Sequence, residues 1–125
     1  MFRTTEAFSS FAVDDMARAR QFYGETLGIS VSEEEMGVLS LRLHGDTAVM
    51  IYPKPDFAPA TYTVLNFPVD DIEAAVDDLT GRGVSFERYE GFEADEKGIV
   101  RDELGPAIAW FRDPAGNVLS VLQEK

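Results

Sequence analysis

Cysteine is absent from this chain, and histidine and tryptophan each occur once, at His44 and Trp110. Without cysteine there is no disulfide bond, no thiolate nucleophile and no cysteine-bound zinc or iron–sulfur site. Basic residues are also scarce: 11 lysine and arginine side chains stand against 23 aspartate and glutamate side chains, a formal net charge of -12. This charge repels a phosphate backbone, so we expect no nucleic-acid partner. Such a negative charge ordinarily keeps a protein soluble, although the same charge would also favour a cationic ligand.

Long apolar runs are missing too. No stretch approaches the roughly 20 apolar residues that cross a bilayer, so we expect no membrane association. The first six residues lack the basic and then apolar order of a signal peptide, which makes the cytoplasm the expected compartment. A chain of 125 residues, 45% of them hydrophobic, is long enough for one compact domain and too short for two independent ones. We therefore expect a single domain over residues 1–125.

One sequence pattern occurs twice. Phe11-Ala-Val-Asp-Asp-Met and Phe67-Pro-Val-Asp-Asp-Ile both lead from an alternating apolar segment into a double aspartate and then an apolar residue. The pattern is typical of a strand that turns into a helix, with Asp15 and Asp71 as helix N-caps. Apolar residues then recur at spacings of three and four, as on one face of a helix: Met16, Ala19, Tyr23 and Leu27 in the first copy, and Ile72, Ala75, Val76 and Leu79 in the second.

The rest of the chain repeats the same order of elements. Turn residues and alternating apolar residues predict strands at 6–13, 29–32, 38–43, 47–52, 61–69, 84–89, 107–112 and 117–123. We therefore predict an α+β fold of two βαβββ modules, residues 6–52 and 61–123, joined by a proline-rich connector at 53–60. The turn Asp113-Pro-Ala-Gly116 should form a hairpin, because proline presets φ and glycine permits the corner. The acidic, glycine-containing segment 90–106 is predicted to be a lid, hairpin arm or binding loop.

Strand alternation separates the side chains into two faces. One face should pack beneath the helices, and it carries Phe11, Val13, Val49, Ile51, Leu65, Phe67, Val69, Leu119 and Val121. The opposite face is the candidate ligand site, formed by Phe8, Ser10, Met50, Tyr52, Val64, Asn66, Trp110, Arg112, Ser120 and Leu122. An apolar face with a few hydroxyl, amide and aromatic groups is typical of a small-molecule site. The alternative is that these residues fill a collapsed cup or a dimer contact.

These motifs, in this order, resemble the vicinal oxygen chelate superfamily. They are Val13-Asp-Asp, then Phe22-Tyr23 and Leu27-Gly28, the second Val69-Asp-Asp, and the closing segment 111–123. The family includes glyoxalase I, extradiol dioxygenases, fosfomycin-resistance enzymes and bleomycin-resistance proteins. The resemblance implies two βαβββ modules whose sheets curl into an open cup, usually in a homodimer, with the ligand held in the cup.

The same resemblance places the metal ligands of the family's enzymes at Phe8, Met50, Val64 and Ser120. None of these is a competent ligand, because zinc, nickel, iron and manganese take imidazole, carboxylate or thiolate donors. His44 lies beside a turn glycine, where a solvated loop residue is expected. We therefore expect neither a metal nor another cofactor.

Three acidic motifs suggest chemistry but have simpler explanations. The aspartate pairs of the repeat are better explained as helix caps than as acid–base catalysts. The runs Glu33-Glu34-Glu35 and Glu93-Ala-Asp-Glu96 are expected to be solvated rather than to hold calcium.

Two main functional hypotheses follow from the sequence. In the first, the protein is a metal-free homodimer that binds an apolar, aromatic or cationic small molecule in the cup. In the second, it is a lyase or a dioxygenase-like enzyme with a non-standard site. That site would be either an acid–base pair, such as Tyr52 with Glu87 or Glu90, or a metal site that does not follow the family positions. A third possibility is a domain that acts by pairing with another protein. The sequence does not define the ligand.

Overall fold

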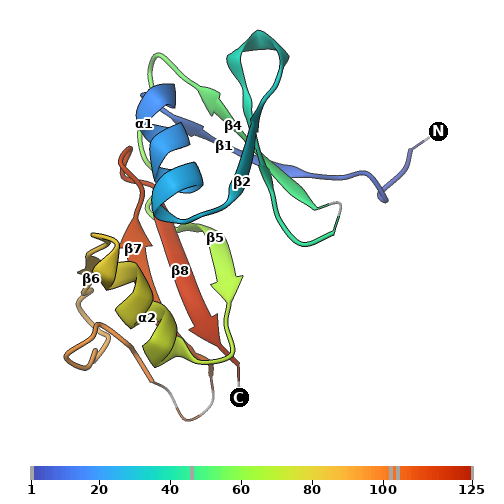
Figure 1. Ribbon diagram of the computed structural model, residues 1–125. Coiled ribbons are helices and arrows are strands. Elements are labelled where there is room, and N and C mark those ends of the chain that lie inside the picture. The colour runs from blue at the N-terminus through green and yellow to red at the C-terminus, as the bar shows by residue number, and fades with distance from the viewer. Residues whose placement is uncertain (1, 46, 102, 104, 125) are drawn as a thin grey trace. The chain divides into compact units, whose positions relative to one another are not determined.

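The computed structural model describes residues 2–45, 47–101, 103 and 105–124 of the chain (Figure 1). Its contacts divide the chain into two compact units, Met1–Pro59 and Ala60–Lys125. Each unit contains a strand, a helical segment and three further strands, arranged in an open four-stranded sheet. The predicted α+β fold of two βαβββ modules is therefore confirmed.

The first unit has the strand order β1-β4-β3-β2, in which β1 runs parallel to β4 and the other pairs are antiparallel. Asp15 caps its helix, since its carboxylate accepts a hydrogen bond from the Arg18 amide at 3.1 Å. Gly28 follows the helical segment with a φ of 75°, a conformation that glycine adopts without strain. The elements are β1 (Ser9–Val13), α1 (Met16–Gln21), the π-helical turn η1 (Phe22–Thr26), β2 (Ser30–Glu33), the 3-10 turn η2 (Glu35–Gly37), β3 (Leu39–Arg42) and β4 (Ala48–Pro53).

The core of the first unit lies between α1 and one face of the sheet. Tyr23 is fully buried, and its ring contacts Phe11 at 6.0 Å and Phe22 at 5.1 Å between centroids. The other buried apolar residues of this unit are Val13, Ala19, Leu39, Leu41, Val49 and Ile51.

The second unit repeats this plan with the strand order β5-β8-β7-β6. Asp71 caps its helix in the same way as Asp15, accepting from the Ala74 amide at 3.1 Å. The elements are β5 (Thr63–Pro68), α2 (Ile72–Gly81), β6 (Phe86–Glu87), β7 (Ala107–Arg112) and β8 (Val118–Gln123). Its buried apolar residues are Ile72, Val76, Val84, Ile99, Ala109, Phe111, Val118, Leu119 and Val121.

The hairpin between β7 and β8 is held by a buried polar cluster. One oxygen of Asp113 accepts hydrogen bonds from the Ala115 and Asn117 amides at 3.0 and 2.8 Å. The other accepts from the Asn117 side chain at 3.1 Å, and Gly116 supplies the corner with a φ of 97°. The predicted turn is therefore confirmed, and its aspartate satisfies amides that the turn would otherwise leave unpaired.

One sequence prediction on extent was wrong, because the strand predicted at 84–89 is limited to Phe86–Glu87. The segment 90–106, predicted to be a lid, hairpin arm or binding loop, turns back on itself through an antiparallel bridge between Ala94 and Val100, and it also contributes one residue to the core. Ile99 of that segment is 1% exposed, and Val100 bridges to Ile108 on the outer edge of β7. Within the described ranges, no helix is long and apolar enough to cross a membrane.

Candidate ligand-binding face

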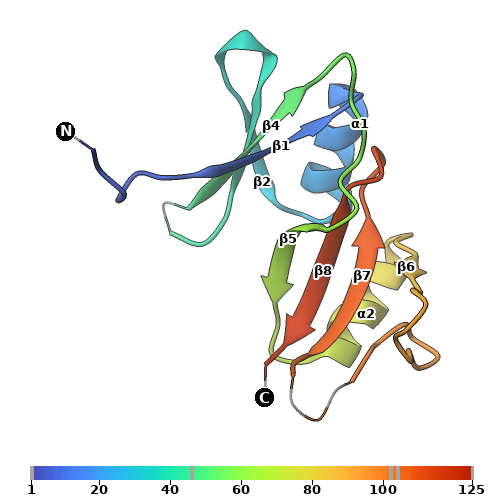
Figure 2. The same ribbon diagram turned by 180° about the vertical axis from the view of Figure 1, so that it is seen from behind.

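Four side chains form a row across the sheet of the second unit, on the face opposite α2. The strand register pairs Asn66 of β5 with Ser120 of β8, Ser120 with Trp110 of β7, and Trp110 with Glu87 of β6. Paired residues of neighbouring strands point to the same face, so the register alone brings these side chains together. Figure 2 shows the sheet from this side, with α2 behind the strands.

The polar end of the row is a hydrogen-bonded pair. The Ser120 hydroxyl donates to the Asn66 side-chain oxygen at 2.5 Å. Ser120 is fully buried, so this bond meets the requirement of a buried hydroxyl for a partner. Asn66 itself is exposed, and its side-chain amide nitrogen is a hydrogen-bond donor.

The aromatic end of the row is larger than the sequence indicated. Tyr89 and Phe92 both contact Trp110, with ring centroids 5.5 and 5.4 Å from the indole. Phe92 is 54% exposed, whereas Trp110 is half-buried. Sequence reasoning did not include Tyr89 or Phe92 in the site. The available signal was two aromatic residues, three positions apart, in a segment otherwise rich in glycine and acidic residues.

Arg112 lies on the same face and is ion-paired. Its Nε donates to Glu87 Oε1 at 2.6 Å, and its Nη1 donates to the Gly116 carbonyl oxygen at 3.3 Å. The hydrogen bond to Glu87 raises the pKa of the Arg112 guanidinium above its usual value, and the nearby Tyr89 phenol adds to this effect. Even so, the Tyr89 hydroxyl is buried and completes no well-formed hydrogen bond with any described residue.

Two other predicted site residues lie at the borders of the row. Leu122 pairs with Pro68 and Ile108, and its apolar side chain is half-buried on the same face as Ser120. Val64 falls at an irregularity between the pairs Thr63–Val118 and Leu65–Leu119. Simple alternation assigned Val64 to the ligand face, but an irregularity in register breaks the period of two on which that count depends.

The remaining predicted site residues belong to the first unit. Ser10 is paired with Met50, and Tyr52 with Ala12, on the face of the first sheet opposite α1. Phe8 precedes β1 and is 67% exposed. Of the residues in the acid–base hypothesis, Tyr52 lies in the first unit, whereas Glu87 and Glu90 lie in the second.

The positions that would hold a metal do not carry suitable donors. Phe8 and Val64 have no lone pair, Met50 offers only a thioether, and the Ser120 hydroxyl is hydrogen-bonded to Asn66. Over the described part of the chain, no group of three histidine, aspartate or glutamate side chains could hold a metal ion. These residues therefore do not fit the metal site of the family's enzymes.

The paired βαβββ modules with open sheets define the class of fold. A family model for the Glyoxalase/Bleomycin resistance protein/Dioxygenase superfamily matches residues 7–121, and the chain belongs to this family. The uncharacterized protein YraH of Bacillus subtilis is 27% identical over 124 residues, covering 87% of this chain and 90% of that protein.

Two solved structures illustrate the likeness of fold. TnmS3, an antibiotic binding protein from Streptomyces sp. CB03234, has 24% identity and a TM-score of 0.71, covering 99% of this chain and 100% of its own. A superfamily member from Sphaerobacter thermophilus has 25% identity and a TM-score of 0.68, covering 94% and 97%.

Proposed function

We propose that this protein is a metal-free binding protein that holds an apolar, aromatic or cationic small molecule against the open face of its second unit. The observation that carries the proposal is the continuous row of Asn66, Ser120 and Trp110, bordered by the apolar side chains of Ile108 and Leu122. An aromatic platform next to a few fixed polar groups is the usual composition of a small-molecule site. TnmS3, which has a similar fold, is an antibiotic binding protein, and this supports the proposal that the present chain binds a small molecule.

Each group has a distinct role in this proposal. The Trp110 ring supplies apolar contact area and a π face that attracts a cation or stacks on an aromatic ring. Asn66 sets the orientation of the ligand by hydrogen bonding, while Ser120 holds the Asn66 side chain in place. Covering about 100 to 200 Å² on each partner yields roughly 5 to 10 kcal/mol before the costs of association, at about 25 cal/mol/Å².

A thermal-shift screen of aromatic and cationic compounds, followed by calorimetric titration of the hits, tests the proposal. A ligand at about 100 times its dissociation constant stabilises the protein by about 2.7 kcal/mol, which such a screen detects. Trp110→Leu should weaken binding at least about tenfold, since it removes most of the contact area. The matched control is Phe67→Leu, the same type of change on the helix-facing side of the same sheet. Equal affinity in Trp110→Leu and the wild type would contradict the proposed face.

The enzyme alternative makes a different prediction about metal. Elemental analysis of the purified protein should find no stoichiometric zinc, nickel, iron or manganese under the binding proposal. A stoichiometric metal, together with an activity that is lost to a chelator and restored by that metal, would establish a non-standard catalytic site instead.

The proposal includes a cytoplasmic homodimer. Several large apolar side chains are exposed on a single chain, and association is the usual way to cover such surface: Phe2, Phe8, Met36, Tyr62 and Phe92. Sedimentation at tens of micromolar should give twice the chain mass of 13.8 kDa. A monomer alone under these conditions would contradict the dimer.

A further inference from the structure

Residues 88–101, here called the strap, leave β6 and return to the edge of the same sheet. The end of the strap is firmly anchored. Val100 exchanges two backbone hydrogen bonds with Ile108, at 2.8 and 3.0 Å, and the adjacent Ile99 is 1% exposed. Gly98 has a φ of 86°, and a Cβ there would lie 3.0 Å from the Phe86 Cβ, so the chain passes too close to Phe86 for a side chain.

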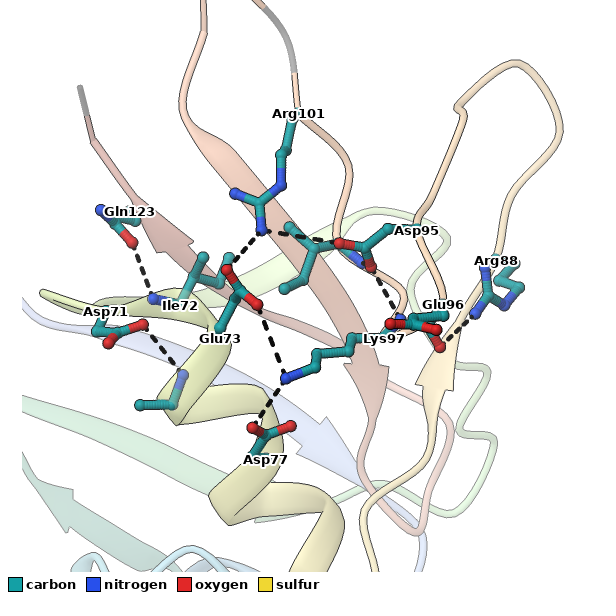
Figure 3. Close-up of polar contacts among 12 residues, drawn as sticks. Asp71, Ile72, Glu73, Asp77, Arg88, Asp95, Glu96, Lys97, Arg101 and Gln123 are labelled. Atoms are coloured by element: carbon teal, nitrogen blue, oxygen red, sulfur yellow. Dashed lines mark hydrogen bonds and ion pairs between the residues drawn. The ribbon is translucent and has the colours of Figure 1, made fainter.

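The middle of the strap is held to α2 by charge. Figure 3 shows Lys97 reaching two carboxylates of the helix: its Nζ lies 2.9 Å from Asp77 Oδ2 and 3.7 Å from Glu73 Oε1. Arg101 lies 3.4 Å from the other oxygen of Glu73. A cavity of about 340 Å³ lies here, lined by residues of both α2 and the strap, including Asp77 and Lys97. The strap is thus held across a cavity by exposed ion pairs, which salt weakens.

The first part of the strap rests on the candidate ligand face. Phe92 and Tyr89 contact the Trp110 indole, and Gly91 between them has a φ of 89°. Residues 90–93 are all exposed to solvent. The Tyr89 hydroxyl is buried and forms no well-formed hydrogen bond with a described residue, which is unfavourable for a polar group. This part therefore has weaker attachments than the anchor at Ile99.

We propose that the strap is a lid over Trp110 and that Lys97 is the residue that positions it, by binding Asp77 and Glu73. In the closed form, which is the form of this structure, the Tyr89 and Phe92 rings cover the Trp110 indole. In the open form they leave it, the Tyr89 hydroxyl gains a partner, and an aromatic or cationic ligand takes their place. The proposal rests on the proposed function only in taking Trp110 as the ligand platform.

The single tryptophan allows the lid to be observed without any ligand. Acrylamide quenching of Trp110 fluorescence measures how often the indole is uncovered. An exposed ion pair contributes about 0.2 to 1 kcal/mol, so Lys97→Met should raise the open population about 1.4- to 5-fold, with a matching increase in quenching. At about 1 M salt, where the Debye length is about 3 Å, the wild type should approach the variant.

The matched control is Arg82→Met, which removes an exposed ion pair to Asp78 of the same helix at 3.0 Å, between two residues outside the strap. Its quenching should equal that of the wild type. Asp77→Asn, which changes the helix side of the contact, should reproduce the effect of Lys97→Met, and the double variant should add nothing further. This second variant keeps the test decisive if Lys97→Met fails to fold.

Unchanged quenching in both Lys97→Met and Asp77→Asn, or an equal increase in Arg82→Met, would overturn the lid. Such a result would leave the proposed function standing, because the titration of Trp110→Leu against Phe67→Leu decides that question separately. The converse result is that Trp110→Leu binds ligand as tightly as the wild type while Lys97→Met increases the quenching. That pair of results would support a strap that moves but would contradict a ligand at Trp110.

Discussion

The two units share one plan on the helix side of their sheets and differ on the open side. Asp15 and Asp71 cap their helices with hydrogen bonds of the same length, 3.1 Å. The open faces contain equivalent rows with different chemistry. The row is Ser10, Met50, Ser40 and Ser32 in the first unit, and Asn66, Ser120, Trp110 and Glu87 in the second.

The connections after the second strand of each unit differ as well. In the first unit the three residues Glu35–Gly37 form a 3-10 turn before β3. In the second unit the strap occupies this place and carries Tyr89 and Phe92 onto Trp110. The repeated framework of cap, helix and sheet therefore carries different side chains on the open sides of the two sheets.

The largest effects should come from the equivalent core positions Leu41 and Phe111, both fully buried beneath the helices. Leu41→Ala should lower the free energy of unfolding by about 2 to 5 kcal/mol and Phe111→Ala by about 3 to 5 kcal/mol, through lost burial and the cavity left behind. Urea unfolding followed by circular dichroism measures both. A loss below about 1 kcal/mol at either position would show that its unit lacks a fixed core.

The hairpins of the two units should respond unequally. Asp113→Ala leaves the Ala115 and Asn117 amides without their acceptor and should cost about 1 to 3 kcal/mol in unfolding free energy. Leu43 is the equivalent residue of the first unit, since its amide bonds to the Thr47 carbonyl as that of Asp113 bonds to Asn117. Leu43 is half-buried, so Leu43→Ala should cost less than Asp113→Ala in the same denaturation experiment. The reverse order would mean that the polar cluster contributes little.

The helix caps should respond equally. Asp15→Ala and Asp71→Ala each remove one hydrogen bond to a first-turn amide and should each cost about 1 kcal/mol. The controls are Asp14→Ala and Asp70→Ala, the neighbouring aspartates, which should change the unfolding free energy by less than about 0.5 kcal/mol. Clearly different costs for Asp15 and Asp71 would break the equivalence of the two units.

Local sequence signals were enough for the framework. Caps, helix stripes and the Asp113 turn depend on residues a few positions apart, and these predictions are confirmed. The sequence predicted a lid, hairpin arm or binding loop at 90–106. The position of the strap in the unit could not be predicted, because it depends on contacts between Lys97 and the distant residues Glu73 and Asp77. Glu73 lies outside the predicted apolar stripe of its helix, and that pattern gives no sign of these partners.

Only part of the candidate ligand face could be predicted from the sequence. Alternation placed Asn66, Ser120 and Trp110 on one side of the sheet, and the strand register puts them side by side. Tyr89 and Phe92 were missed because they lie outside regular strands, where no period indicates a direction. Whether this face binds a ligand stays a prediction.

The smallest effect should come from Asp95, which has no counterpart in the first unit. Burial acts to raise the pKa of this carboxyl, but hydrogen bonds from the Ile99 and Lys97 amides, together with the charges of Arg101 and Arg88, lower the pKa below its usual value. A lowered folded-state pKa means that the carboxylate stabilises the fold above its unfolded pKa of about 3.9, and that this contribution is lost as the pH falls through the folded value.

Asp95→Asn should therefore be less stable than the wild type at pH 7. The loss should be smaller than in the cap variants because Asp95 is partly exposed, and the difference should shrink below about pH 4. Unfolding free energies of both proteins between pH 7 and about pH 2.5 measure this, with Glu35→Gln in the corresponding turn of the first unit as the control. A difference that stays constant across this range would show that the strap gains nothing from the charge of Asp95.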